Sequence, residues 1–165
     1  MNVDALNALP PDAARTTLLR CCDSHRWAEL MIARRPFESA DDLCRAAAEI
    51  WASLDRPDWL GAFAAHPRIG DLDSLLKKFA STADWAKGEQ AGVAGAGDDI
   101  IRSLATGNRD YEAKFGYIFI VCATGKSAAE MLAILRGRLE NDAETEIAIA
   151  AVEQAKITRL RLERL

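Results

Sequence analysis

The chain has 165 residues, of which 50% are hydrophobic and 28% are charged. This balance excludes extended disorder, and the length is that of one ordinary domain, so we expect a single domain over residues 1–165. A net charge of -4 and a pI near 5.3 offer no excess of positive charge, so neither nucleic acid nor an anionic membrane surface is an expected partner.

Several absences in the sequence point to a cytoplasmic, cofactor-free protein. No apolar run approaches the roughly 20 residues that span a bilayer, and the first residues lack a positively charged stretch before an apolar one. The cysteines show no C-x-x-C spacing, so we expect reduced, buried thiols at Cys21, Cys22, Cys44 and Cys122. With two histidines in the chain and no Cys/His cluster, we expect no metal.

Three early helices are predicted from polar residues that stand where N-caps belong. Asp12 precedes residues 13–22, Ser24 precedes 25–35 and Ser39 precedes 40–54. In the third segment, apolar residues recur at spacings of three and four, which predicts a core-facing side made of Leu43, Ala47, Ile50, Trp51 and Leu54.

The middle of the chain reads as short helices with a glycine-rich interruption. Asp58 is the expected cap of a helix that ends at His66, because the following proline disfavours helical backbone there. Residues 71–80, 98–106 and 108–115 each fit a short helix. Residues 89–97, EQAGVAGAG, fit neither helix nor strand.

The last third of the chain combines a strand-like run with two helices. A lone strand has no partner elsewhere in the sequence, so we predict a buried extended segment near residues 117–123. Ser127 and Glu130 form a capping box before the next helix, and a long helix follows from about Asp142. The predicted fold is an all-α, single-domain bundle of about eight or more helices.

Two of three candidate motifs keep a chemical interpretation. ATGKS fails as a phosphate loop, because Ile120 stands where the Walker pattern needs glycine. His66, between a helix end and a proline, sits where the helix dipole favours imidazolium, although a structural histidine fits the same pattern. Glu89 and Gln90, beside small residues, can orient a polar ligand or form a solvated pair.

Longer strings carry a resemblance to a known family. AFAAHPRIGD, WAKGEQAGV, NRDYEAKFGYIFIVCATGKS and EQAKITRLRLERL, with the early CCDSHRWAELMIARRPF, together resemble the 2-oxo-4-hydroxy-4-carboxy-5-ureidoimidazoline (OHCU) decarboxylases. The resemblance implies an all-helical, cofactor-free homodimer of purine metabolism, a lyase that converts OHCU to S-allantoin and carbon dioxide. This reaction is the last step of uric acid degradation.

The resemblance also assigns roles to individual residues. It implies that His66, Glu89 and Arg161 are catalytic, that Pro67 fixes the histidine, and that Gln90 contacts the substrate. Many members have serine where this chain has Ala86, so one hydroxyl contact to the substrate is missing. Backbone contacts to the substrate are implied for a run of five residues, Phe119, Ile120, Val121, Cys122 and Ala123.

Two alternatives stay open at the level of sequence. A cofactor-free hydrolase or isomerase of another ureide would use the same histidine, glutamate and arginine to activate water. A helical interaction module would need His66 only as a structural residue.

Overall fold

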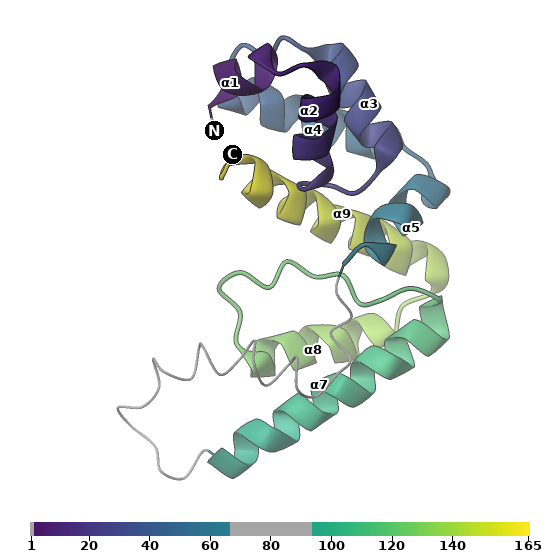
Figure 1. The fold of residues 1–165 in the computed structure, drawn as a ribbon. Helices are drawn as coiled ribbons and strands as arrows, with labels where there is room; N and C mark the ends of the chain where they lie inside the picture. Colours follow the sequence, from purple (N-terminus) through teal and green to yellow (C-terminus); the bar gives the residue numbers. More distant parts are fainter. Residues whose placement is uncertain (1, 67–93) are drawn as a thin grey trace. The chain divides into compact units, whose positions relative to one another are not determined.

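The computed structural model describes residues 2–66 and 94–165, which contain eight α-helices and no strand. This confirms the all-α prediction. The chain divides into two compact units, a first unit of residues 1–66 with 147–165 and a second unit of residues 67–146 (Figure 1). Across the described ranges, no helix has both the length and the hydropathy needed to cross a bilayer.

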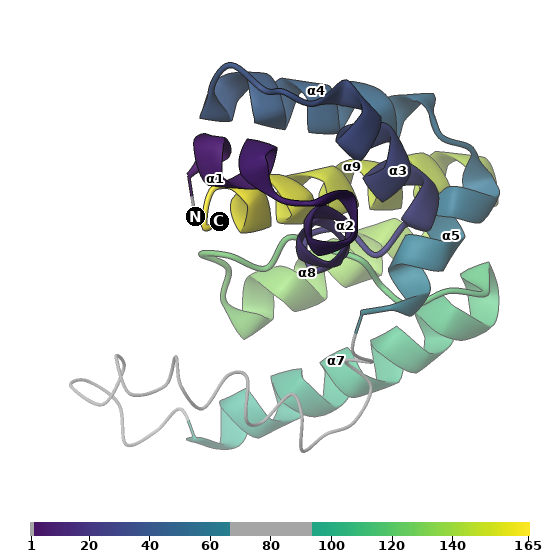
Figure 2. The ribbon, with the colours of Figure 1, turned by 45° about the horizontal axis from the view of Figure 1, so that its top comes forward.

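The first unit contains five helices from the N-terminal part of the chain and most of the last helix. They are α1 (Val3–Ala8), α2 (Pro11–Leu19), α3 (His25–Arg34), α4 (Ala40–Ser53), α5 (Arg56–Ala64) and α9 (Ala143–Leu162). In both ribbon views, α1 lies beside the C-terminal end of α9 (Figures 1 and 2).

Local capping explains where most of these helices begin. The Ser24 and Ser39 side chains accept hydrogen bonds from the backbone N–H groups of Trp27 and Asp42, which confirms the predicted starts of α3 and α4. The cap predicted at Asp58 is wrong, since Asp55 caps α5. A proline in the first turn is tolerated because that turn has no intrahelical N–H bonds to lose, so the helix begins before Asp58.

The start of α2 also differs from the prediction. Pro10 occupies the N-cap position and Pro11 the first helical position, which leaves Asp12 within the first turn. Proline suits this first position because its missing N–H would be unpaired there anyway. The helix ends at Leu19, earlier than predicted, and α1 was not predicted at all.

Tryptophan side chains join the helices of the first unit. Trp27 Nε1 donates to the Ala47 carbonyl at 3.1 Å, which ties α3 to α4. Trp51 Nε1 donates to the Ala151 carbonyl at 2.9 Å, which ties α4 to α9. Each indole buries a large apolar surface and satisfies its one donor, so these contacts hold α9 firmly against α4.

The second unit is built on α7 (Ala94–Phe115) and α8 (Ala128–Leu139), which lie side by side (Figures 1 and 2). The two short helices predicted at 98–106 and 108–115 are one continuous helix, and residues 94–97 of the glycine-rich stretch belong to it. A Cβ at Gly107 would lie 2.7 Å from Leu135 Cδ2, so the glycine serves close helix packing and does not break the helix.

The segment between these helices confirms the sequence prediction. Residues 118–123 are neither helix nor strand, and the side chains from Phe119 to Cys122 are buried. The capping box of Ser127 and Glu130 is present at the start of α8. The four cysteines are buried thiols, as predicted.

Candidate functional site

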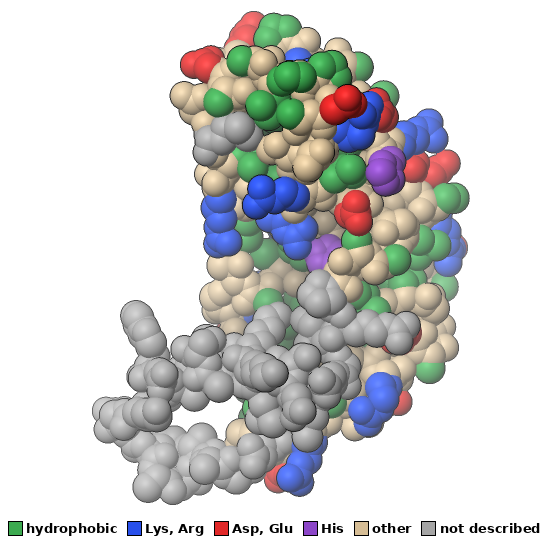
Figure 3. Space-filling model, in the orientation of Figure 1, with side chains coloured by type: hydrophobic (Ala, Val, Ile, Leu, Met, Phe, Trp, Pro, Cys, Tyr) green, Lys and Arg blue, Asp and Glu red, His purple; other side chains and the backbone are tan. Residues whose placement is uncertain are grey.

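A pocket of about 330 Å³ opens in the first unit near the end of α5. Its volume lies near the lower end of the range for small-molecule sites, about 300–1,000 Å³. The residues that line it come from the end of α2 and the turn after it, the end of α5, and the last turn of α9: Leu19, Arg20, Asp23, Ala62, Ala65, His66 and Arg161. Both histidines of the chain reach the face shown in Figure 3.

His66 is held at the end of α5. The helix ends at Ala64, and the His66 N–H donates to the Phe63 carbonyl at 3.1 Å, which closes a final turn. Phe63 is fully buried, so this turn is anchored in the core. The backbone therefore fixes the imidazole at the pocket wall.

A buried polar chain continues from the imidazole into α9. His66 Nε2 lies 2.6 Å from the side-chain oxygen of Gln154, and Gln154 Nε2 donates to Thr158 Oγ1 at 3.2 Å. Gln154 is 0% exposed and Thr158 is 5% exposed. A further hydrogen bond links Thr158 to the thiol of Cys22, whose pKa burial raises to about 12.

The environment of His66 favours neutral imidazole. Burial lowers the pKa of His66 below its ordinary value, the hydrogen bond with Gln154 opposes this shift, and the positive charge of Arg161 adds to it. The expectation that the helix end would favour imidazolium is therefore wrong. Loss of hydration outweighs the helix dipole, whose favourable effect on a cation at a helix C-terminus is typically only about 0.3 to 1 kcal/mol.

Arg161 belongs to the last turn of α9, and its guanidinium is partly tied to backbone. Arg161 Nη1 donates to the Cys21 carbonyl at 3.1 Å, so the turn after α2 orients the side chain. Arg20 adds a second cation to the pocket lining and Asp23 a carboxylate. With His66 neutral, the lining carries two positive charges and one negative, which suits an anionic small molecule.

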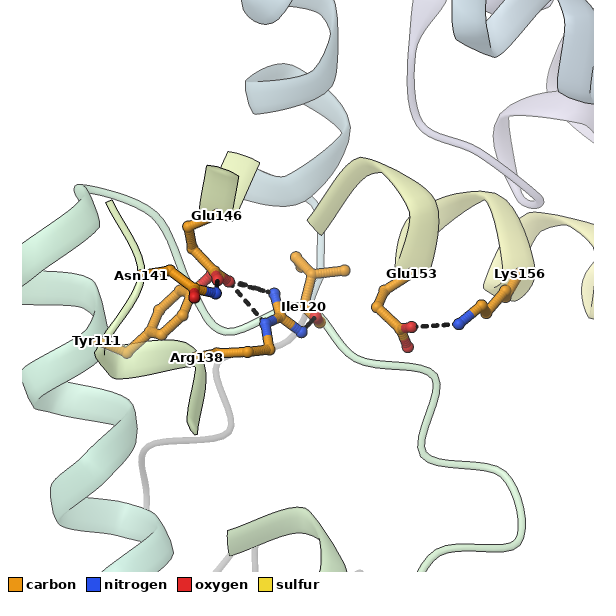
Figure 4. Close-up of polar contacts among 7 residues, drawn as sticks. All are labelled: Tyr111, Ile120, Arg138, Asn141, Glu146, Glu153 and Lys156. Atoms are coloured by element: carbon orange, nitrogen blue, oxygen red, sulfur yellow. Dashed lines mark hydrogen bonds and ion pairs between the residues drawn. The ribbon is translucent and has the colours of Figure 1, made fainter. Parts of the chain in front are cut away.

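The 119–123 segment belongs to the second unit and is held by buried charge. Arg138 Nη1 donates to the Ile120 carbonyl at 2.6 Å, and the Arg138 guanidinium lies 4.7 Å from the centre of the Phe119 ring. Arg138 also pairs with Glu146 at 2.5 Å between Nη2 and Oε1. Tyr111 donates its hydroxyl proton to Glu146, completing the network drawn in Figure 4.

The structure covers only part of the predicted site. His66 and Arg161 line the same pocket, and Phe119 to Ala123 lie in the second unit. Pro67, Ala86, Glu89 and Gln90, with the helix predicted at 71–80, lie outside the described residues. Within the described ranges, no three His, Cys, Asp or Glu side chains gather as metal ligands would.

Sequence reasoning missed three polar neighbours of His66 and Arg161. Arg20 and Asp23 line the pocket, and Gln154 holds the imidazole. A signal for Gln154 was available, because it falls on the otherwise core-facing side of α9 with Ile147 and Ala151. A polar side chain on such a side needs a buried partner. Arg20 and Asp23 carry no comparable signal.

Comparison with known proteins assigns the family. Residues 7–163 match the model of the OHCU decarboxylase family, nearly the whole chain. The chain belongs to the OHCU decarboxylase family. A solved structure described as OHCU decarboxylase in the presence of (S)-allantoin is 35% identical, with a TM-score of 0.69 over 88% of this chain and 94% of that one.

Relatives of this OHCU decarboxylase family member have different lengths. The uric acid degradation bifunctional protein TTL of Arabidopsis thaliana is 38% identical over 148 residues, which are 88% of this chain and 45% of that protein. The OHCU decarboxylase of Amia calva is 35% identical over 133 residues, 78% of this chain and 73% of that protein. The chain thus spans less than half the length of its Arabidopsis relative.

Proposed function

We propose that this chain catalyses the cofactor-free decarboxylation of OHCU to S-allantoin and carbon dioxide, the last step of uric acid degradation. The observation that carries the proposal is one pocket, in a member of this family, that combines a neutral histidine with two arginines. Such a pocket can bind a carboxylate and exchange a proton with the bound molecule.

The chemistry needs an electron sink, and the substrate itself contains one. When the bond to the carboxylate breaks, its electron pair enters the ring C=N and leaves an enolate-like species. The ring nitrogen that receives the electron pair takes up a proton. The hydroxyl on the reacting carbon loses its proton as a carbonyl forms, and the carbon that bears the ureide takes up a proton. Delivery of that proton to one face sets the chirality of allantoin.

We assign the proton transfers to His66, which, when neutral, can accept the hydroxyl proton and then serve as the acid. Arg161 would hold the carboxylate or a ureide carbonyl through its planar fork. Glu89, which the resemblance makes catalytic, would orient the histidine or the substrate. Backbone N–H groups of residues 119–123, for which the resemblance implies contact with the substrate, would stabilise the developing negative charge. The buried Arg138 contact to Ile120 supports a preorganised backbone there.

The decisive experiment mixes purified, EDTA-treated and dialysed protein with freshly generated OHCU. Carbon dioxide is followed by a coupled assay and allantoin chirality by circular dichroism. We expect S-allantoin, one carbon dioxide per turnover, and full activity after EDTA, since the resemblance implies no metal or organic cofactor. Turnover of another ureide without carbon dioxide would favour a hydrolase or isomerase. No turnover of either substrate would favour an interaction module, and restoration by one added metal would contradict a cofactor-free reaction.

We further propose that residues 1–165 act as one domain, that the protein is a homodimer, and that it works in the cytoplasm. The resemblance supports the dimer, and the four buried thiols, which are typical of a reducing compartment, support the location. Light scattering coupled to size exclusion tests the dimer directly, with a mass near twice that of one chain as the expected result.

A further inference from the structure

The buried amide of Gln154 stands out on α9. Its side chain is 0% exposed, and it lies on the core-facing side of the helix between Ala151 and Thr158. A buried amide costs free energy unless its donors and acceptor are paired. Gln154 pairs with two partners, Thr158 on its own helix and His66 from the end of α5, 88 residues away in sequence.

The Gln154 amide presents its two ends to different partners. Its nitrogen donates to Thr158 Oγ1 at 3.2 Å, and its oxygen points to His66. This oxygen can only accept a hydrogen bond, and it lies 2.6 Å from Nε2 of the imidazole. The proton of a neutral imidazole must then sit on Nε2.

We infer that Gln154 is a positioning residue for the proposed reaction, because its buried amide holds His66 as the Nε2–H tautomer and leaves Nδ1 to exchange protons with the substrate. Thr158 acts on His66 indirectly, because its hydroxyl holds the Gln154 amide. The reaction assigned to Nδ1 rests on the proposed function, whereas the tautomer itself does not.

The choice of an amide at this position has a chemical consequence. A glutamate would form an ion pair with imidazolium and favour the charged ring, which has no lone pair to accept a proton. Gln154 orients the ring without adding charge. Among the described residues, the other charged groups around His66 are Arg161, from α9, and the pocket-lining Arg20 and Asp23, from the end of α2 and the turn after it.

The test is an NMR titration of protein labelled with ¹⁵N-histidine, because ring nitrogen shifts report tautomer and charge. The chain has two histidines, and the exposed His25 serves as the internal reference. We expect His66 to be in the Nε2–H form at neutral pH and to have a pKa below the ordinary value for histidine. A wild-type His66 in the Nδ1–H form would overturn the inference.

Variants of Gln154 separate positioning from structure. Gln154→Glu should raise the pKa of His66 and move the acidic limb of the pH–kcat profile to higher pH. Val152→Glu is the matched control, since it adds the same charge to α9 at a side chain that is 56% exposed. Equal titration of His66 in both variants would contradict the inference.

Gln154→Leu removes the acceptor and should lower kcat at least about tenfold, part of the 10² to 10⁴ that general acid–base catalysis contributes. Thr158→Val removes the hydroxyl that accepts from the Gln154 amide but leaves the amide itself in place. We therefore expect kcat to fall by a smaller factor. If Gln154→Leu fails to fold, the tautomer of His66 in the wild type and the titration of His66 in Gln154→Glu still test the inference. An Nε2–H tautomer without OHCU turnover would refute the proposed function alone, and turnover with an Nδ1–H tautomer would refute this inference alone.

Discussion

At the scale of single residues, His66 and Arg161 are held in the pocket in different ways. The imidazole is anchored on both sides, by the Phe63 carbonyl through the backbone and by Gln154 through the ring. Arg161 donates one N–H to the Cys21 carbonyl, and within the described residues its other guanidinium donors have no hydrogen-bond acceptor, so they can serve a ligand. Substitution of each should therefore affect activity far more than folding.

His66→Asn should lower kcat by about 10² to 10⁴, because asparagine cannot accept and return a proton at neutral pH. Thermal melting should remain close to that of the wild type, since the substitution keeps the backbone hydrogen bond from residue 66 to the Phe63 carbonyl. His25→Asn is the control, as this exposed histidine at the start of α3 lies outside the pocket lining. Near-normal turnover of folded His66→Asn would remove the histidine from the mechanism.

Arg161→Lys keeps the charge but loses the planar fork, so we expect kcat/KM to fall at least about tenfold, the loss of one charge-assisted hydrogen bond. Arg159→Lys is the matched control, because Arg159 lies on the same helix and pairs with Glu163 in solvent. Steady-state kinetics of both variants provide the measurement. Activity of Arg161→Lys within about twofold of wild type would contradict the substrate-binding role.

At the scale of helices, one glycine decides how α7 packs on α8. The space over Gly107 is filled by Leu135, a fully buried side chain that cannot swing into solvent. A Cβ added at Gly137 of α8 would meet no other atom within 4 Å. The two glycines therefore form a matched pair for substitution.

We expect Gly107→Ala to lower the free energy of unfolding, because overpacking costs about 1 to 3 kcal/mol and exceeds the gain of about 0.5 to 1 kcal/mol in helix propensity. Gly137→Ala should be neutral or stabilising, since it keeps only that gain. Urea denaturation of both variants measures the difference. Equal stability of the two variants would show that Leu135 moves aside at no cost.

At the scale of the whole molecule, most charged side chains lie at the surface, but a buried ion pair lies in the second unit. Among the described residues, the buried charged side chains are Arg138 and Glu146. Glu146 also accepts from Tyr111 and from Asn141, and Arg138 donates to Ile120 (Figure 4). Because both members of this pair have several partners, the network is sensitive to loss of any one of them.

Arg138→Met should destabilise the protein by about 3 to 5 kcal/mol, because it leaves the Glu146 carboxylate buried without its cation. Arg136→Met, at an exposed position on the same helix, should change stability by about 0.5 kcal/mol or less. The double variant Arg138→Met with Glu146→Gln should recover part of the loss. Chemical denaturation measures all three, and a mild effect of the single change would contradict this account.

The sequence by itself determined the features that depend on neighbours within one turn. The caps at Ser24, Ser39 and Ser127 join residues three apart, so local composition was enough to predict them. The buried cysteines were predicted from the absence of C-x-x-C spacing, and the segment near 117–123 from an apolar run with no strand to pair with. The motifs around His66 and Arg161 indicated the family, which the comparison then established.

Tertiary structure decided what depends on partners far apart in the sequence. In the sequence, Gly107 resembles a break between two helices, whereas in the structure Leu135 packs over it and the helix continues. The helix-end argument for a charged His66 fails because the side chain is buried. The hydrogen bond between His66 and Gln154 joins residues 88 apart. No local pattern specifies such a pair, because the tertiary fold that brings His66 to α9 sets both the distance and the loss of hydration that makes the contact matter.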